Sequence, residues 1–128
     1  ITEPIKNLKI NGTYHYDEGF YYFRDIDHRV LLGGGRNLNF KAEESNVLKV
    51  TDLIQKKLEH LLYDVVLPNQ QVKIDYRWSG IMGFGDELEP IIKKLRNGVY
   101  LAARCNGMGI ALGSLTGQEI AELVLADL

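Results

Sequence analysis

Three glycines near the end of the chain have types and spacing that could serve nucleotide binding. Gly107, Gly109 and Gly113 stand in RCNGMGIALG, between the apolar run GVYLAA and a helix-forming sequence. In a dinucleotide-binding turn such glycines permit a tight bend, close approach of the backbone to a pyrophosphate, and packing of helix on strand. The free N–H groups at the helix start, with about half a positive charge, would face an electron-rich ligand.

The match to the dinucleotide fingerprint is incomplete. The spacing is GxGxxxG, and Leu112 stands where the short form requires Gly or Ala. The residues after Gly107 are used by one helix, so no second strand with an acidic residue for the ribose follows. A complete Rossmann site is therefore excluded. Two interpretations stay open: the turn offers N–H groups to a ligand, or its glycines only permit tight packing.

Other candidate residues give weaker signals. His15, His28 and His60 are scattered without metal-ligand spacing, so we expect no metal site. Cys105 is the single cysteine, which excludes an internal disulfide, and we expect it to be structural. We expect Arg36, which follows three glycines, to pair with an acid rather than with a phosphate. No catalytic residue can be named from these patterns.

The first part of the chain predicts an antiparallel sheet. The segments TYHYD, GFYYFRD and HRVLLGG are rich in aromatic and aliphatic residues and are separated by the turn signals EG and DIDH. We therefore expect three consecutive strands. Tyr21 and Phe23 should lie on one face of the second strand, and Phe20 and Tyr22 on the other.

The rest of the chain predicts two main helices and two further strands. An apolar stripe at helical spacing indicates a helix over about residues 46–66, capped by Ser45 or Asn46. QVKIDYRWSGIMGFG is typical of a strand that ends in glycines, Pro90 opens a connection, and GVYLAARC is a short strand. The final helix is expected over residues 111–127, with an apolar stripe at Ile110, Leu115, Ile120, Leu123 and Val124.

Composition limits the function classes. The chain has 128 residues, 45% of them hydrophobic and 25% charged, which is typical of an ordinary globular chain. A net charge of -2 provides no broad basic surface for nucleic acid. No apolar run is long enough to span a membrane. The chain begins with Ile1 and no targeting segment precedes it, so we expect a removed N-terminus and, by default, a cytoplasmic location.

Four motifs in order resemble one family over nearly the whole chain. They are GFYYFRDIDHRVLLGGGRN, LLYDVVLP after a helix, YRWSGIMGFGDELEPII, and NGVYLAARCNGMGIALGSLTGQEIAELVL. Together they look like the C-terminal part of FAD-dependent amine and amino-acid oxidases, the D-amino acid oxidase, glycine oxidase and sarcosine oxidase group. The resemblance implies an FAD-dependent oxidoreductase that takes a hydride from its substrate onto the flavin.

The family resemblance also implies a fold and a missing partner. It implies an α+β fragment of a two-domain flavoprotein, with an antiparallel sheet and two main helices. Residues 1–80 would be mainly substrate-domain strands plus the helix at about 46–66, and residues 81–128 the returning strand and C-terminal helix of the FAD domain. The N-terminal FAD-binding motif has no counterpart here, so we expect FAD in the full-length protein, not on this fragment, which should be inactive alone.

By the same resemblance, the glycine turn lies beside the pyrimidine end of the flavin ring. Its cofactor-binding residues would be Asn106, Gly107, Met108, Gly109 and Ile110. Their N–H groups and the helix dipole would stabilise the negative charge that gathers at N1 and the C2 carbonyl on reduction. Hydride transfer depends on positioning the substrate and on excluding water from the flavin face more than on an acid or base. The lack of a catalytic dyad is therefore compatible with this chemistry.

The expected substrate pocket contains Tyr21 and Met82. Relatives that bind amino acids commonly have an arginine clamp where WSGIMG has Met82, and Met cannot hold a carboxylate. This leaves a less acidic amine, or a clamp from Arg77 or Arg104. Tyr21 matches a pocket tyrosine of the glycine oxidase branch, where its hydroxyl would orient the substrate; plain core packing is its alternative.

Two classes of function remain at this point. The first is a fragment of a flavoprotein that acts on an amine or amino acid, with the absent FAD domain as its partner. Surfaces left open by that absence would favour self-association. The second is a stand-alone small α+β binding or assembly module in which the glycine turn serves only packing.

Overall fold

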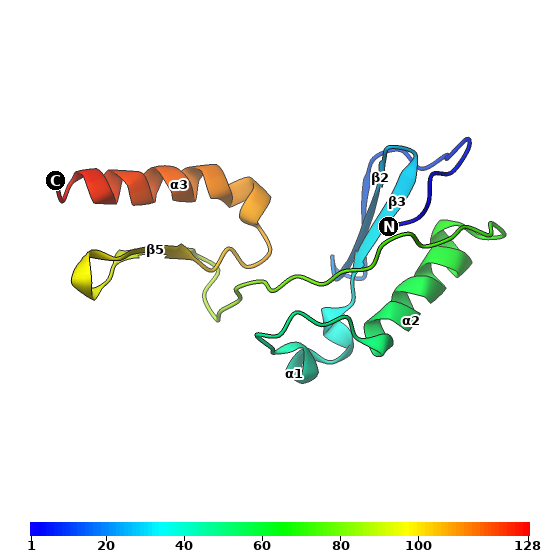
Figure 1. Cartoon of the computed structure of the whole chain (residues 1–128), viewed down its shortest axis with the longest axis horizontal. Coiled ribbons are helices and arrows are strands. Elements are labelled where there is room, and N and C mark those ends of the chain that lie inside the picture. Colours follow the sequence, from blue (N-terminus) through cyan, green and yellow to red (C-terminus); the bar gives the residue numbers. More distant parts are fainter. The chain divides into compact units, whose positions relative to one another are not determined.

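A computed structural model describes all residues from Ile1 to Leu128 and divides them into two compact units, Ile1–Gly80 and Ile81–Leu128 (Figure 1). Each unit combines an antiparallel sheet with helix, so the predicted α+β class is confirmed. None of the helices has both the length and the apolar character needed to cross a bilayer. The assignment of the two parts to a substrate domain and an FAD domain stays a prediction.

The first unit is built on three consecutive antiparallel strands, as the sequence predicts. They are β1 (Thr13–Tyr16), β2 (Tyr21–Ile26) and β3 (Arg29–Gly34), in the order β1-β2-β3. Asp27 and His28 form the turn between β2 and β3, with φ of 48° and 60°. Positive φ at both central residues is the signature of a type I′ hairpin turn, which matches the right-handed twist of the strands.

The end of β3 approaches the start of β2 very closely. Gly34 pairs with Tyr21, and the Gly35 N–H donates to the Phe20 carbonyl over 2.9 Å. Two short helical turns follow, η1 (Arg36–Leu38) and α1 (Phe40–Glu43).

Aromatic rings hold Arg36 beside the sheet. Its guanidinium carbon lies 5.2 Å from the ring centroids of both Phe20 and Phe40, within the range of cation–π attraction. The expected pairing of Arg36 with an acid rather than a phosphate stays a prediction.

The long helix begins later than the sequence predicts. It comprises α2 (Asp52–His60) and a π-helical continuation, η2 (Leu61–Val66). The expectation of a start near residue 46 is wrong: the Ser45 hydroxyl accepts from the Val47 N–H over 3.0 Å, and Thr51 is extended. A side-chain bond of this kind gives the backbone an alternative to helix, which is why Ser45 and Asn46 cap nothing here.

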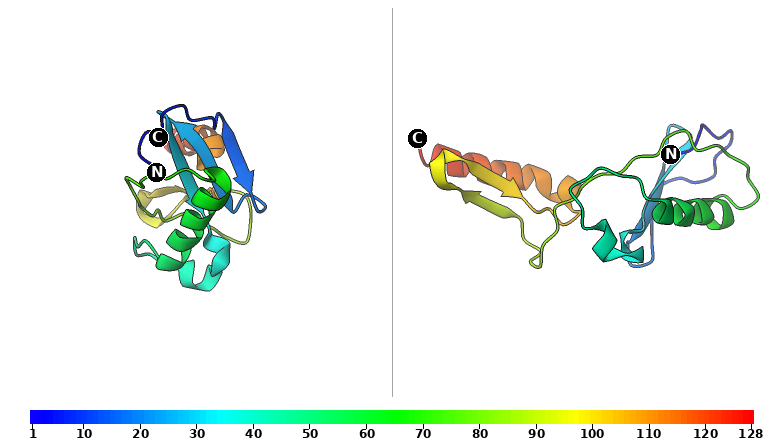
Figure 2. Two further views of the ribbon diagram at one scale, coloured as in Figure 1. Left: turned by 90° about the vertical axis from the view of Figure 1, so that its right-hand side faces the viewer. Right: turned by 60° about the horizontal axis from the view of Figure 1, so that its bottom comes forward.

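The core of the first unit lies between the sheet and this helix. Figure 2 shows α2 running beside the sheet, and contacts between α2 and β3 agree. The buried apolar cluster consists of Ile5, Val30, Leu62 and Leu67. Phe23 packs against the same cluster, whereas Tyr22 is exposed, so the two faces predicted for β2 are separated as expected.

The strand predicted from Gln71 into the glycines is not formed. Ile74 makes one isolated antiparallel bridge, with Thr2, and the segment continues as extended chain. Its partners are the first residues of the chain: the Glu3 N–H donates to the Lys73 carbonyl over 2.9 Å. A ladder needs a partner of its own length, and this short segment supports only one bridge.

The second unit is a hairpin covered by a helix. The strands β4 (Ile91–Lys94) and β5 (Tyr100–Ala103) pair antiparallel through η3 (Arg96–Gly98), and α3 (Gly109–Leu125) runs along them (Figure 1). The strand predicted in GVYLAARC is confirmed as β5, and the predicted final helix is confirmed as α3. The sequence predicts a connection after Pro90, and this expectation is wrong because β4 begins at Ile91. Asn97 and Gly98, with φ of 68° and 70°, form a turn whose Asn-Gly signal predicts such a hairpin.

The face of α3 that packs on the hairpin differs from the predicted stripe. Thr116 is buried, and Leu112, Ile120 and Leu123 are partly buried on the same face, while Ile110 is fully exposed at the helix start. Leu115, also in the predicted stripe, is half exposed.

A polar cluster pins the end of α3 to the hairpin. Asp127 accepts from the Tyr100 hydroxyl over 2.5 Å and pairs with the Lys94 ammonium over 2.9 Å. The hydrogen bond from Tyr100, followed by that from Lys94, lowers the pKa of Asp127 below its ordinary value. The bond to Asp127 in turn raises the pKa of Lys94 and of Tyr100.

This cluster predicts a pH dependence for the last turn of α3. A lowered carboxyl pKa contributes stability above the unfolded value, and that contribution disappears as pH falls through the folded value. The raised pKa values of Lys94 and Tyr100 have the opposite sense, so their contribution disappears in strong alkali. Amide protection factors near residue 125 should hold at neutral pH and fall in acid. In Asp127→Asn the protection factors should be lower at neutral pH and should change little as the pH falls. An equally steep loss of protection in acid would contradict the role of the Asp127 carboxylate.

Candidate functional site

The turn between β5 and α3 is shaped by three residues in the left-handed region. Arg104, Asn106 and Gly107 have φ of 62°, 49° and 82°. Such values cost little for Gly and Asn but more for Arg, so surrounding contacts must hold the turn in place. The Met108 N–H donates to the Cys105 carbonyl over 2.7 Å, and the chain then enters the helix.

The start of α3 presents backbone donors to the outside of the unit. Met108 stands at the N-cap without a side-chain cap, and the first bonds of the helix run from the N–H groups of Ala111 and Leu112 to the Met108 carbonyl. The N–H groups of Gly109 and Ile110 are thus left to bond outside the chain, as the first donors of a helix do. They form an anion-favouring end of the helix.

The glycines keep this end open. A Cβ at Gly109 would meet nothing nearer than the Cys105 Cβ at 3.8 Å, and one at Gly107 nothing nearer than the Phe84 ring at 3.9 Å. The chain itself therefore does not require Gly109 for packing. The packing-only interpretation left open from the sequence is not supported at this position.

The structure brings the segment after WSG against the same turn. The Asn106 N–H donates to the Gly83 carbonyl over 3.2 Å, and the Gly85 N–H donates to the Asn106 side-chain oxygen over 3.0 Å. Residues 83–85, from the motif that begins at WSG, and the RCNGMG turn thus form one local structure in the second unit.

Both arginines considered as carboxylate clamps have acidic partners within the chain. The Arg104 Nη2 lies 2.8 Å from a Glu87 carboxylate oxygen, and its Nε donates to the Glu89 carbonyl over 2.9 Å. Arg77 pairs with Glu59 over 2.7 Å. Glu87 is therefore an ion-pair partner of Arg104.

The two expected pocket residues lie in different units. Tyr21 is only 1% exposed, in the sheet of the first unit, and Met82 is half exposed in the segment that opens the second. Burial, with smaller effects of Asp17 and Tyr16, raises the pKa of the Tyr21 phenol, so the hydroxyl stays protonated near neutral pH. The substrate roles of Tyr21 and Met82 stay predictions.

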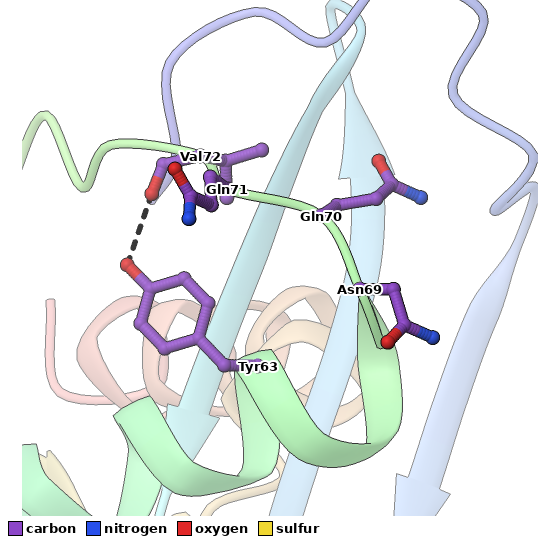
Figure 3. A pocket seen from close by; sticks show the side chains of 5 residues that line it. All are labelled: Tyr63, Asn69, Gln70, Gln71 and Val72. Carbon is purple, nitrogen blue, oxygen red and sulfur yellow. Dashed lines mark hydrogen bonds between the residues drawn. The ribbon is translucent and has the colours of Figure 1, made fainter.

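A separate pocket of about 460 Å³ lies in the first unit (Figure 3). The Tyr63 hydroxyl donates to the Val72 carbonyl over 3.0 Å and connects η2 to the segment that follows it. The other lining residues are Asn69, Gln70 and Gln71. The side chains of Asn69 and Gln70 point away from the Tyr63 hydroxyl in Figure 3, so the pocket does not gather convergent polar groups.

No group of three or more His, Cys, Asp or Glu side chains is placed to hold a metal ion. His60 pairs with Asp64 one helical turn away, over 3.3 Å. Cys105 is a free thiol, partly buried in the turn.

Sequence reasoning missed the side-chain contacts of the turn. Asn106 was expected to contribute only its backbone, yet its side chain bonds to three backbone groups of residues 85–88. The available signal was Asn-Gly after a strand, which favours a left-handed conformation. The partners could not be found in this way, because they lie 18 to 21 residues earlier.

Comparisons with known proteins identify the family to which the sequence is similar. The sequence profile of the DAO family, described as FAD dependent oxidoreductase, matches residues 1–123. The chain is 29% identical to the probable oxidoreductase OrdL of Haemophilus influenzae (strain Rd) over 84% of its length and 22% of that protein. It is also 29% identical to the gamma-glutamylputrescine oxidoreductase of Escherichia coli (strain K12), over 84% of its length and 23% of that protein.

The chain thus spans less than a quarter of the length of these relatives. No solved structure matches it. The family match covers nearly all of the chain, including the sheet, the segment after WSG and the glycine turn. This chain therefore belongs to the DAO family of FAD-dependent oxidoreductases.

Proposed function

We propose that this chain is the C-terminal portion of an FAD-dependent oxidoreductase that oxidises an amine or amino acid by hydride transfer, and that it is inactive alone. The observation that carries the proposal is the open start of α3, in a chain whose family uses FAD. The remaining part of the enzyme would supply the pyrophosphate-binding motif that this chain lacks. The chain's own contribution would be one edge of the flavin site.

The residues of the turn fit a flavin edge. The pyrimidine side of the ring carries carbonyl oxygens and N1, which accept hydrogen bonds, and the turn offers N–H donors at Gly109 and Ile110. The absence of side chains at Gly107 and Gly109 lets a flat ring approach the backbone. In the complete protein Gly109 and Ile110 would donate to FAD, while Asn106, Gly107 and Met108 would line the same turn, since the Asn106 and Met108 N–H groups are bonded within the chain.

FAD, when bound, supplies the acceptor for a hydride from the substrate C–H. The turn would stabilise the negative charge that accompanies flavin reduction, through fixed N–H dipoles that need no reorganisation. Tyr21, whose phenol stays protonated, would orient the substrate through its hydroxyl. None of these residues needs to change protonation state.

The substrate class favoured is an amine without a carboxylate beside the reacting carbon. Met82 offers no charge to a carboxylate, and Arg77 and Arg104 are engaged with Glu59 and Glu87. Gamma-glutamylputrescine, the compound in the name of one relative, is therefore a reasonable first substrate to test.

The partner would be the rest of the flavoprotein. Large apolar side chains stay exposed in this chain, among them Leu48, Trp78, Leu88 and Ile110. Surfaces of this kind favour burial against another domain, or self-association where that domain is absent. We place the enzyme in the cytoplasm by default.

The test is flavin binding and reduction by the complete protein. It should purify yellow, with a flavin absorption spectrum that is lost when an amine is added without oxygen; residues 1–128 alone should bind no flavin. The panel would contain gamma-glutamylputrescine, primary and secondary amines, and α-amino acids. A complete protein that binds no FAD would contradict the proposed cofactor. One that binds FAD but is reduced by none of these compounds would contradict the proposed substrates.

A further inference from the structure

The Asn106 side chain is bonded on both sides of its carboxamide to the loop before it. Its Oδ1 accepts from the Gly85 N–H over 3.0 Å, and its Nδ2 donates to the Glu87 and Leu88 carbonyls over 2.9 and 3.1 Å. One side chain thus satisfies three backbone groups of an otherwise exposed loop. Only one acceptor site of the carboxamide is left over.

Arg104 reinforces the same contact from two residues away. Its Nε donates to the Glu89 carbonyl, and its side chain is only 17% exposed although it carries a charge. A Cβ at Gly85 would lie 2.5 Å from the Arg104 Cδ, so the loop lies directly on the arginine stem. The loop and the turn are fitted to each other as well as bonded.

Both side chains project from backbone in the left-handed region, which costs more for Arg than for Asn. Arg104 and Asn106 have positive φ, and such values persist only where surrounding contacts determine them. The bonds to residues 83–89 are these contacts. They also set the path of the next residues, Gly107 to Ile110, which carry the outward N–H groups.

We propose that Asn106 and Arg104 are positioning residues that lock the loop at residues 83–89 to the glycine turn and thereby aim the N–H groups of Gly109 and Ile110 at the flavin edge. The inference rests on the proposed function, since it takes the flavin as the ligand of those groups. Asn106 carries most of the effect because its three bonds are to backbone. The Arg104–Glu87 ion pair contributes little, because Glu87 is 77% exposed.

The variant Asn106→Gly tests this in the complete flavoprotein. Glycine keeps the positive φ but removes the three side-chain bonds. Asn97→Gly is the matched control, because Asn97 also has positive φ, 68°, and makes no side-chain hydrogen bond. Glu87→Gln removes only the ion pair and should bind FAD with wild-type affinity within two-fold; it is used for this readout alone, because it lacks the Glu87 cleavage site.

Two readouts separate loop locking from flavin positioning. In the apoprotein, glutamyl endopeptidase should cut after Glu87 about ten-fold faster in Asn106→Gly, because the loop opens more often. In the holoprotein, the same variant should bind FAD about ten-fold more weakly and show a more negative flavin midpoint potential. Asn97→Gly should change neither quantity.

The outcomes distinguish this inference from the proposed function. Unchanged cleavage in Asn106→Gly would show that the side chain does not lock the loop and would overturn the inference. Faster cleavage with unchanged FAD affinity and potential would also overturn it, because locking would then be structural only. A wild-type protein that binds no FAD would instead refute the proposed function, while its cleavage result would still report on the loop.

Discussion

Gly34→Ala is expected to unfold the first unit. It should lower the free energy of unfolding by about 3 to 5 kcal/mol, which is comparable to the whole stability of a small unit. A Cβ at this position would lie 2.0 Å from the Phe20 carbonyl oxygen and 2.8 Å from the Tyr21 Cα. Both neighbours are backbone, so neither can swing away. The Phe20 carbonyl is also fixed by the Gly35 N–H, over 2.9 Å.

Gly12→Ala is the matched control for this substitution. Gly12 has φ of 115° against 116° for Gly34, but a Cβ there would meet nothing within 4 Å. It should therefore cost only the conformational strain of about 1 to 2 kcal/mol. Urea titrations followed by circular dichroism measure both variants. Equal losses of unfolding free energy in the two variants would show that the close approach of β3 to β2 contributes nothing to the cost of Gly34→Ala.

The consecutive strands and the last helix could be predicted because their signals are local. Dense aromatic and β-branched residues between turn signals mark β1 to β3, and a glycine turn followed by an apolar pattern marks α3. The start of α2 could not be placed. Val47 and Leu48 continue the apolar pattern upstream, yet both stay exposed, and the bond to Ser45 favours a turn.

Strand pairing was less predictable than strand composition. Residues 71–79 have the composition of a strand but find only a short partner at the start of the chain, so one bridge forms at Ile74. β4 has only four residues, too few for a clear strand pattern, although the Asn97-Gly98 pair after it is a usable hairpin signal.

The candidate site was predictable at the level of backbone and not of side chains. The glycine spacing and the helix that follows indicate an electropositive turn, and the structure places such a turn at the start of α3. The contacts of Asn106 and Arg104 with residues 83–89 depend on how two separate segments come together. Residue spacing alone carries no information about such contacts.

Gly109→Val is expected to have the largest effect on cofactor binding. The isopropyl group would stand in front of the outward N–H groups at the start of α3 and prevent a flat ring from reaching them. Lost hydrogen bonds and steric overlap together should weaken FAD binding by about 10- to 100-fold, or about 1.4 to 2.8 kcal/mol. The chain itself tolerates the change, because nothing lies within 3.8 Å of that Cβ.

Gly113→Val provides the control one turn further along the same helix. A Cβ at Gly113 meets nothing within 4 Å and one at Gly109 only the Cys105 Cβ at 3.8 Å, so neither variant clashes with the rest of the chain. Any difference in FAD affinity between the two variants therefore reports on the ligand in front of the helix start. Gly113→Val should retain FAD affinity within about two- to three-fold, since it lies beyond the first turn where the helix end acts on a ligand.

The decisive measurement is the FAD dissociation constant of the complete apoprotein, determined by fluorescence titration for wild type, Gly109→Val and Gly113→Val. A flavin edge at the glycine turn predicts binding by wild type and Gly113→Val and a loss of at least ten-fold in Gly109→Val. Equal FAD affinity in all three proteins would contradict the placement of the flavin at the start of α3.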